Sequence, residues 1–476
     1  MKKIIFSALA ALALTTAAAQ DLRSAYFLGG NTFGHNLNPA FAPERGYLTL
    51  PVLPGNLSVS VGSNFGADML IFPYNQNGYR NTTFLSPTVS VADFESGLND
   101  KNRVSVNLRY NIMGTGFRAW GGYNTIDVAL RAQAAANVPG DLLRLAKSGM
   151  TSAEGTTYDL SGLRATAMSF AEIAFGHSRE VVPGRLRLGA KAKVLLGVGR
   201  ADIDVEDATV VMSQSAWRVT TNGTARMAFK GTELKLKNVN NGIGEIDEID
   251  IDGGGISGFG LGFDLGASYN ASHLVDGLTL SAALLDLGFI SWSNGYDATT
   301  KDEFDFAGFK QPIPTDNHDS DPNAIKNQWK QIEDDFEGLY RLTSDGQKKS
   351  YTTGLGATLN IGAAYTLPSH PKLTMGLLSS TFIKGAYSTT ELRLSANYAL
   401  ARAIDTSLSY GLGTYGGSMG WVINLKPSGF NFFLAGEHNF AKFNPQGIPT
   451  KSALHSINLG MNITLGKKTE KTRFVY

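Results

Sequence analysis

Six charged side chains stand at alternate positions of otherwise apolar stretches, and this spacing makes them the best candidates for binding chemistry in the chain. Successive side chains of a β-strand point to opposite faces, so each charge would share a face with small polar neighbours and lie opposite an apolar face. Such a polar face suits a crowded or wet lumen better than a surface exposed to solvent. The candidates for a polar, lumen-facing surface are Arg109, Arg187, Lys191, Lys193, Glu391 and Arg393.

Signatures of catalysis and of cofactor binding are weak. The seven histidines, among them His177, His438 and His455, are scattered, and none stands beside a serine and carboxylate pattern typical of nucleophilic catalysis. The spacing Gly253-x-Gly255-x-x-Gly258 matches a dinucleotide fingerprint, but it precedes a strand pattern and does not open a helix. We therefore expect no enzyme activity and no cofactor.

Acidic residues alternate with isoleucine between Glu245 and Asp252. Their carboxylates could bind calcium, which prefers oxygen ligands. The alternation is more typical of a solvated extracellular strand, so we expect no metal site there.

The composition is rich in glycine and aromatic residues and poor in charge. The 476 residues include 54 Gly, 26 Phe and 17 Tyr, and only 17% are charged, whereas soluble chains contain about a quarter. The formal net charge of +1 gives no electrostatic basis for a nucleic-acid partner. The chain has no cysteine, which excludes disulfides and thiolate metal sites.

The first residues predict export. Lys2 and Lys3 precede the apolar run 4–14, and three alanines at 17–19 supply small residues for cleavage, so residues 1–19 are expected to form a signal peptide. No later stretch reaches the roughly 18 apolar residues that a helical membrane span requires. An exported chain without helical spans is periplasmic, secreted or a barrel of the outer membrane.

The strand pattern favours the barrel. From Phe259 to Tyr269 apolar residues alternate strictly with Gly, Asp and Ser, and similar alternation recurs in 57–65, 104–112 and 391–400. Soluble β-sandwiches also alternate. These strands, however, have about ten residues or more, where soluble strands average about five or six. We therefore predict an all-β fold, an antiparallel transmembrane β-barrel.

The strand count follows from parity. A long extracellular loop with an amphipathic helix at 324–342 is expected over 291–351, because turns on the periplasmic side are short. An odd number of strands must then precede the strand at 259, which gives 14 strands, or 16, and a periplasmic C-terminus.

Two strands break register, near Leu284 and near Phe170, as β-bulges would. The nine later strands are predicted at 259–269, 278–290, 352–366, 373–383, 389–400, 405–415, 417–426, 429–440 and 455–466.

A motif near the N-terminus carries a family resemblance. Asn38-Pro39-Ala40 follows the signal peptide and precedes the first clear strand. An exported barrel with this opening resembles the FadL-type superfamily of long-chain fatty-acid transporters, and an uncharacterised FadL-related family whose kin include the PorV-type shuttle protein of type IX secretion. The resemblance implies 14 strands around an N-terminal hatch that contains Asn38, Pro39 and Ala40. The expected division is a hatch at 20–54, a barrel at 55–466 and a C-terminal tail at 467–476.

These features together predict a protein of the outer membrane of a Gram-negative bacterium, surrounded by outer-membrane lipid. The leading hypothesis is passive uptake of small hydrophobic or amphipathic compounds through a hatch-gated lumen. The alternatives are a PorV-like interaction barrel that binds an exported protein partner, and a structural envelope protein.

Overall fold

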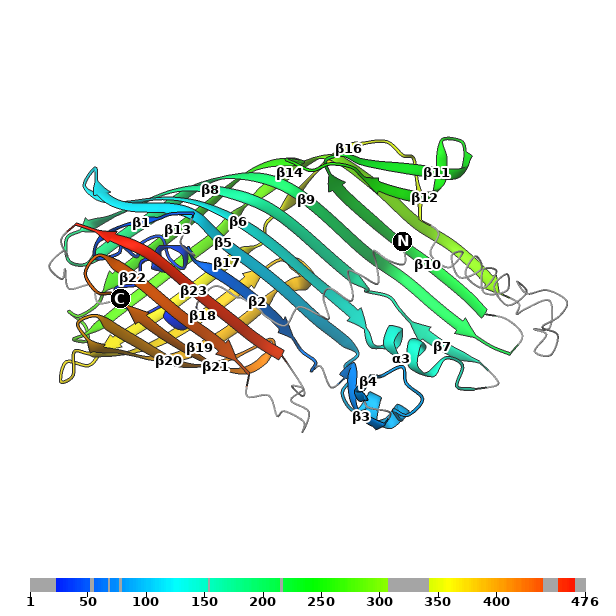
Figure 1. The fold of residues 1–476 in the computed structure, drawn as a ribbon, viewed down its shortest axis with the longest axis horizontal. Helices are drawn as coiled ribbons and strands as arrows, with labels where there is room; N and C mark the ends of the chain where they lie inside the picture. Colours follow the sequence, from blue (N-terminus) through cyan, green and yellow to red (C-terminus); the bar gives the residue numbers. More distant parts are fainter. Residues whose placement is uncertain are drawn as a thin grey trace.

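Alternating apolar and polar residues give this chain long strands that pair side by side until the last strand meets the first (Figure 1). The computed structural model describes residues 23–51, 55–66, 69–76, 79–152, 155–214, 217–306, 342–439 and 453–466. The predicted signal peptide, nearly all of the predicted helix at 324–342 and the predicted tail lie outside the described residues.

Fourteen strands form the wall, each paired antiparallel with two neighbours. The ring closes because β23 pairs with β2, and β2 pairs with β5. In pairing order the wall strands are β2 (Leu57–Ser63), β5 (Lys101–Ala119), β6 (Gly122–Pro139), β8 (Arg164–Val182), β9 (Leu186–Met212), β13 (Gly258–Asn270), β14 (Leu278–Phe306), β17 (Ala357–Thr366), β18 (Leu373–Ile383), β19 (Thr389–Ala401), β20 (Ile404–Gly413), β21 (Gly416–Leu425), β22 (Phe430–His438) and β23 (Ala453–Leu465).

The predicted count of 14 is thereby confirmed and the alternative of 16 is wrong. Five wall strands precede β13, an odd number as parity required, and nine follow from β13 onward. The barrel has two unlike ends. At one end, the short-turn rim, β5–β6, β8–β9, β19–β20 and β21–β22 are joined by a few residues each; the other end is the long-loop rim.

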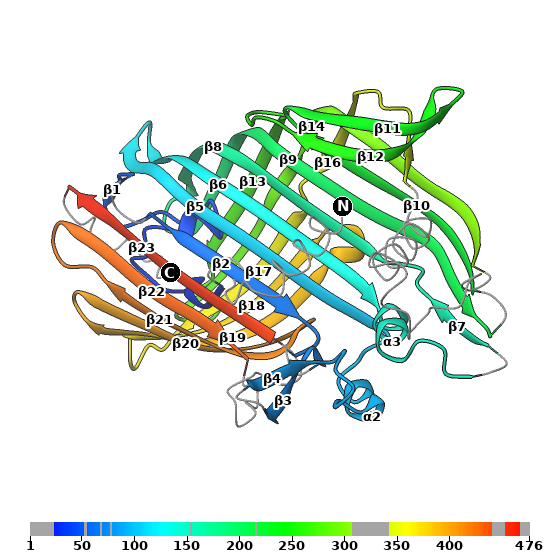
Figure 2. The same ribbon diagram turned by 45° about the vertical axis from the view of Figure 1, so that its right-hand side comes forward.

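Two positions in the wall are each filled by two collinear strands (Figure 2). β1 (Gly46–Thr49) and β2 both pair with β23 and β5, so the sheet begins at Gly46, earlier than the expected start at residue 55. Between β9 and β14, β10 (Trp217–Phe229) fills the part near the long-loop rim and β13 the rest. The hairpin of β11 (Thr232–Asn240) and β12 (Ile243–Ile251) is inserted between them.

The predicted loop at 291–351 is therefore wrong at both ends. β14 continues to Phe306 because β10 pairs with its polar second half. The short strands β15 (Thr343–Ser344) and β16 (Lys349–Gly354) also pair with β14. Residues 293–302 are polar and resemble a loop in sequence, but they are strand because a partner supplies their backbone hydrogen bonds.

Polar side chains lie on the inner face of the wall and apolar ones on the outer face. In β13, Phe259, Phe263 and Leu265 are half exposed, whereas Asp264 and Ser268 are buried. A soluble barrel would show the opposite arrangement, whereas an apolar outer face is typical of transmembrane β-barrels.

One predicted bulge is confirmed and the other is misplaced. β14 breaks register with β13 after Leu284, and Asp286 adopts a positive φ of 58° there. β8 shifts register against β9 after Ser169, but its own alternation is unbroken, because Met168, Phe170 and Glu172 are all buried on one face. The extra residue is Val198 of β9, which has no partner in β8. Because β8 carries the apolar residues Met168 and Phe170 on its inner face, its sequence resembles that of a strand with a one-residue bulge.

Smaller elements gather at the long-loop rim. β3 (Ile71–Gln76) and β4 (Tyr79–Thr83) form a separate two-stranded sheet, next to the helix α2 (Val91–Glu95). The helix α3 (Gly140–Ser148) follows β6, and β7 (Thr156–Asp159) pairs with the end of β9. Within the described residues, no helix is long and apolar enough to cross a membrane.

A tight contact inside the wall gives a test of this architecture. A Cβ atom at Gly197 would lie 2.6 Å from the ring of the fully buried Trp292. Gly197→Ala should lower the free energy of unfolding by about 1–3 kcal/mol, because a packed ring cannot move aside without strain. Urea unfolding in phospholipid vesicles, followed by tryptophan fluorescence, measures this. Gly254→Ala is the matched control, since a Cβ there meets nothing within 4 Å; equal losses would contradict the packing.

Candidate functional site

The N-terminal segment, residues 23–45, lies inside the barrel (Figure 2). It begins with two short 3-10 helices, η1 (Arg23–Ala25) and η2 (Gly34–Asn36). Its hydrogen bonds reach strands on several sides of the ring: β6, β9, β13, β14, β17, β19, β22 and β23. The segment is thus held across the lumen and not along one wall.

The Asn38-Pro39-Ala40 motif attaches this segment to the wall. Asn38 is fully buried, and its Oδ1 accepts a hydrogen bond of 2.9 Å from the backbone N–H of Ala40, which fixes a local turn. Its Nδ2 donates to the carbonyl oxygens of Ala267 and Ala282, each at 3.2 Å. Pro39 has no N–H to satisfy at this crowded place.

A first polar anchor joins the start of the segment to β19 and β22. Both the backbone N–H and the Oγ of Ser24 donate to Oε1 of Glu437, at 3.0 and 2.6 Å. Arg393 donates through Nε to Glu391 at 2.7 Å and lies 3.2 Å from Oε2 of Glu437. Arg23 lies 3.4 Å from Oε2 of Glu391. Two guanidinium groups and two carboxylates therefore meet at the docked segment.

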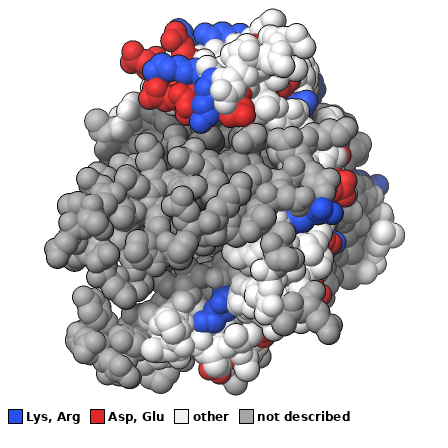
Figure 3. Space-filling view, turned by 90° about the vertical axis from the view of Figure 1, so that its right-hand side faces the viewer, with Lys and Arg blue, Asp and Glu red and all other residues white. Residues whose placement is uncertain are grey.

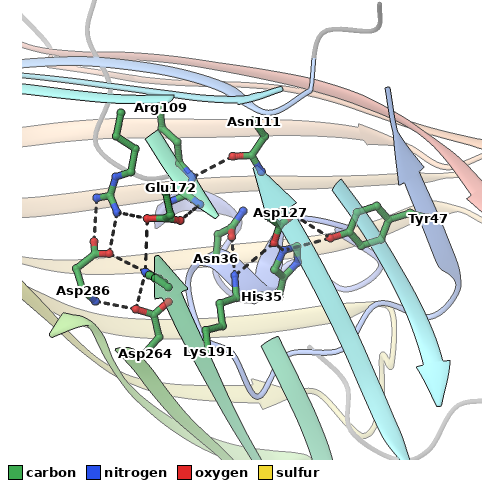
Figure 4. Close-up of polar contacts among 12 residues, drawn as sticks. His35, Asn36, Tyr47, Arg109, Asn111, Asp127, Glu172, Lys191, Asp264 and Asp286 are labelled. Carbon is green, nitrogen blue, oxygen red and sulfur yellow. Dashed lines mark hydrogen bonds and ion pairs between the residues drawn. The ribbon is translucent and has the colours of Figure 1, made fainter. Parts of the chain in front are cut away.

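A second anchor joins the middle of the segment to β6 and β9 (Figure 4). Nε2 of His35 lies 3.0 Å from Oδ2 of Asp127. The hydroxyl of Tyr47 lies 3.2 Å from the same ring nitrogen. Lys191 donates to Oδ1 of Asn36 at 2.8 Å and lies 3.8 Å from Asp127.

Six charged residues from six neighbouring strands form a central ion-pair cluster, drawn in Figure 4. The bond lengths are those of strong charge-assisted hydrogen bonds. Glu172 accepts from Arg109 and from Arg131, each at 2.9 Å. Arg131 also binds Asp286 through two bonds of 2.7 and 2.9 Å. Lys193 lies 2.7 Å from Asp286 and 2.6 Å from Asp264.

The central cluster balances its own charge. It contains three cations and three anions, and each is buried. Removal of so many charges from water is costly, and only close pairing with full hydrogen bonding offsets the desolvation. Asp286 reaches both Arg131 and Lys193 from the bulge with positive φ, a conformation that costs a non-glycine residue about 1 kcal/mol or more. The pairing holds that strained conformation in place.

An apolar cluster lies next to the ion pairs, toward the long-loop rim. Arg131 connects the two, since its guanidinium lies 5.3 Å from the ring centre of Phe170. Tyr351 packs against the cluster from its edge. The buried members are Met168, Phe170, Leu195, Ala228, Ile290, Trp292 and Leu355.

The inner face of β9 shows the order of these layers. Leu195 belongs to the apolar cluster, and Lys193 belongs to the ion-pair cluster. Lys191 binds the N-terminal segment at Asn36. Gly189 lies directly against the same segment, since a Cβ atom at Gly189 would lie 2.1 Å from the carbonyl oxygen of Pro39. From the long-loop rim inward, the lumen therefore presents an apolar layer, an ionic layer and then the N-terminal segment.

The structure distributes the six candidates from the sequence over four places. Arg109 and Lys193 lie in the central cluster, Lys191 binds the N-terminal segment, and Glu391 and Arg393 form the first anchor. Arg187 lies apart, paired with Glu180 at 2.7 Å near the short-turn rim.

Sequence reasoning missed the carboxylates that these cations require. A signal was present, because buried basic residues on neighbouring strands require acidic partners at inward positions. Asp264 stands at such a position in the clearest strand. The missed partners, together with Arg131, are Asp127, Glu172, Asp264, Asp286 and Glu437.

The residues that the structure describes include no group of three or more His, Cys, Asp or Glu side chains able to hold a metal ion. The acidic residues of β12 pair instead with lysines of β11: Lys235 lies 2.7 Å from Glu248 and 2.8 Å from Asp250. The glycines at 253–258 lead into a strand and not a helix, so they form no dinucleotide site.

The model of a family of unknown function, DUF5723, matches residues 39–436. The chain belongs to this DUF5723 family. No curated protein matches it.

Solved structures that resemble this DUF5723 chain include the P. putida toluene transporter TodX, with 9% identity over 94% of this chain and 95% of that one and a TM-score of 0.38. The Ralstonia pickettii toluene transporter TbuX has 8% identity over 96% of each chain and a TM-score of 0.39. A Pseudomonas aeruginosa FadL homologue has 11% identity over 95% and 98%, with a TM-score of 0.38.

The central cluster predicts a large effect of a single neutralisation. Glu172→Gln should lower the free energy of unfolding by about 3 kcal/mol or more, because Arg109 and Arg131 each lose a carboxylate partner while both stay buried. Urea unfolding in phospholipid vesicles measures the loss. Glu248→Gln, in an exposed pair with Lys235, is the matched control and should leave the unfolding curve unchanged. Equal curves for the two variants would show that the cluster adds no stability.

Proposed function

We propose that this protein is a gated channel of the outer membrane of a Gram-negative bacterium, through which small hydrophobic or amphipathic compounds enter. One observation carries the proposal: the N-terminal segment lies across the lumen of a closed barrel and is held there by two polar anchors on different walls. A segment placed in this way blocks passage, and its displacement opens a route. Residues 23–45, with Asn38, Pro39 and Ala40, are then the hatch.

The outer surface supports the membrane location. Outward leucine, isoleucine and phenylalanine side chains surround the barrel, for example Phe263 of β13, Leu377 of β18, Leu394 of β19 and Leu408 of β20, which are 46–59% exposed. Exposure of so much apolar surface to water would be costly. Outer-membrane lipid is the partner that such a surface fits.

The layered lumen supports an amphipathic or hydrophobic solute. The apolar layer around Trp292 matches the hydrocarbon part of such a solute in chemistry, and the ionic layer around Arg131 lies directly beyond it. In this class of barrel short turns face the periplasm, so the short-turn rim and the end of β23 are placed on that side. The solute would enter at the long-loop rim and meet the hatch last.

A second candidate function is binding of an exported protein partner at the long-loop rim. The hairpin of β11 and β12 projects there and carries exposed charges of both signs, which gather at the upper edge of that end in Figure 3. Within the described residues β11 has ladder pairing with β12 alone, so its other edge could pair with an extended segment.

Release of the anchors gives the test of gating. In planar bilayers the native protein should show no stable current, while a variant without residues 23–45 should conduct steadily. The double variant Asp127→Asn/Glu437→Gln should open intermittently, because both anchors lose a charged acceptor. Glu180→Gln removes a partner of Arg187 that lies outside both anchors, and it is expected to stay closed. Absence of current from the deletion variant would contradict the proposed gated channel.

The partner hypothesis makes a different prediction. Replacement of residues 233–250 by a short turn should abolish co-purification of an exported protein with the barrel, because the charged hairpin is lost. The same replacement should leave the current of the hatch-deleted protein unchanged, since the hairpin lies outside the lumen. If the partner is retained, or if no exported protein accompanies the native barrel, this function is excluded.

A further inference from the structure

A hollow opens at the short-turn rim between the N-terminal segment and the barrel. It holds about 430 Å³ of space not filled by atoms, part of it open to solvent. The N-terminal side contributes Gly30, Thr32, Glu44 and Arg45, and the wall contributes Arg402, Lys426, Pro427, Asn431 and Thr464. Four parts of the chain that are distant in sequence therefore meet around one space.

The charge of this lining is unbalanced, unlike that of the central cluster. Three basic side chains, Arg45, Arg402 and Lys426, face one acidic side chain, Glu44. Within the described part of the chain, Lys426 pairs with Asp405, whereas Arg45 and Arg402 form no ion pair. Two guanidinium groups therefore border the hollow without a carboxylate of their own.

The position of Lys426 depends on Gly30. This glycine has a φ of +76°, and a Cβ atom there would lie 2.5 Å from the Nζ of Lys426. The ammonium group of Lys426 thus lies directly against the backbone of the N-terminal segment at Gly30. A side chain at position 30 would push it out of the hollow and would strain the turn.

Neutral hydrogen-bond donors complete the lining. Thr32 is buried, donates to Asn431 at 2.8 Å and accepts from Asn462 at 2.6 Å, so its hydroxyl is fixed. Thr464 differs, because its Oγ1 is buried and has no hydrogen-bond partner among the described residues. A buried hydroxyl without a partner is costly, and a ligand that accepts its hydrogen bond would remove that cost.

We infer that this hollow binds a small oxyanion, the carboxylate or phosphate of a solute that leaves the barrel. Guanidinium groups bind such oxygens through paired hydrogen bonds, and the hydroxyl of Thr464 adds a further donor. We assign the ligand to the lumen side and not to the bilayer, because Thr32 and Asn431, at 4% and 1% exposure, belong to the interior, whereas Arg402 is exposed in the turn between β19 and β20. The inference rests on the proposed function for its role in transport, since it gives the exit of the channel a preference for anions.

Binding is tested on the full-length protein without any measurement of flux. Isothermal titration calorimetry in phosphatidylcholine nanodiscs uses inorganic phosphate and acetate as probes, and acetamide as the neutral analogue of acetate. The native protein should bind at least one of the two anions at millimolar concentration and should not bind acetamide. Arg45→Gln/Arg402→Gln should weaken the binding by roughly tenfold or more, because two charge-assisted contacts are lost.

Arg185→Gln is the matched control, since Arg185 is exposed in the turn between β8 and β9 at the same rim but does not line the hollow. It should leave anion binding unchanged. No binding of either anion, equal binding of acetamide, or unchanged binding by the double variant would overturn the site. Loss of binding when phosphatidylglycerol is added to the nanodiscs would assign the hollow to a lipid headgroup and would also overturn the proposal. Conductance after hatch removal is independent of these titrations, so failure of the anion site and failure of the channel are distinguishable.

Discussion

The interior of this barrel depends on the pairing of buried charges. A wall with an apolar outer face must place its polar residues inside, where bulk water is restricted and an isolated charge is costly. Arg109, Arg131 and Lys193 on the inner faces of β5, β6 and β9 are therefore each matched by a carboxylate from another strand or from a bulge. The same requirement fixes the N-terminal segment, because Glu437 and Asp127 receive hydrogen bonds or close contacts from it.

This constraint explains why the lumen is layered. The central cluster has no net charge and uses its own partners, so it binds the strands to one another and holds the bulge at Asp286. The two anchors include residues of the N-terminal segment, so their partners are complete only while that segment is docked. The hollow at the short-turn rim keeps uncompensated basic groups. Rigidity, closure and affinity for a ligand are thus assigned to different sets of side chains.

Much of the wall could be predicted from the sequence, because a period of two residues is a strong signal when the strands are long. The nine strands from β13 onward lie within a few residues of their predicted positions, apart from the extension of β14 and the break between β16 and β17. The signal failed where a strand was polar on both faces. The second half of β14 and the strand β10 have no clear alternation, and only their pairing with each other across distant parts of the chain makes them strands. The alternation of residues within single strands identified the charged candidates. Which of them lie together depends on how neighbouring strands are aligned, and the pattern of a single strand does not contain this information.

The docking of the N-terminal segment determines the order in which this protein can assemble. The backbone N–H of Ser24 donates to a carboxylate 413 positions later in the chain, and Thr32 binds residues of β22 and β23. The part of the chain that leaves the ribosome first therefore cannot reach its final place until the last strands are present. Contacts between such distant positions are formed slowly, since a long loop must close before any of them is gained. During that interval the aromatic side chains of the segment, among them Tyr26, Phe27 and Phe33, have no interior to enter, and the unassembled chain must be kept from aggregation until the ring closes around them.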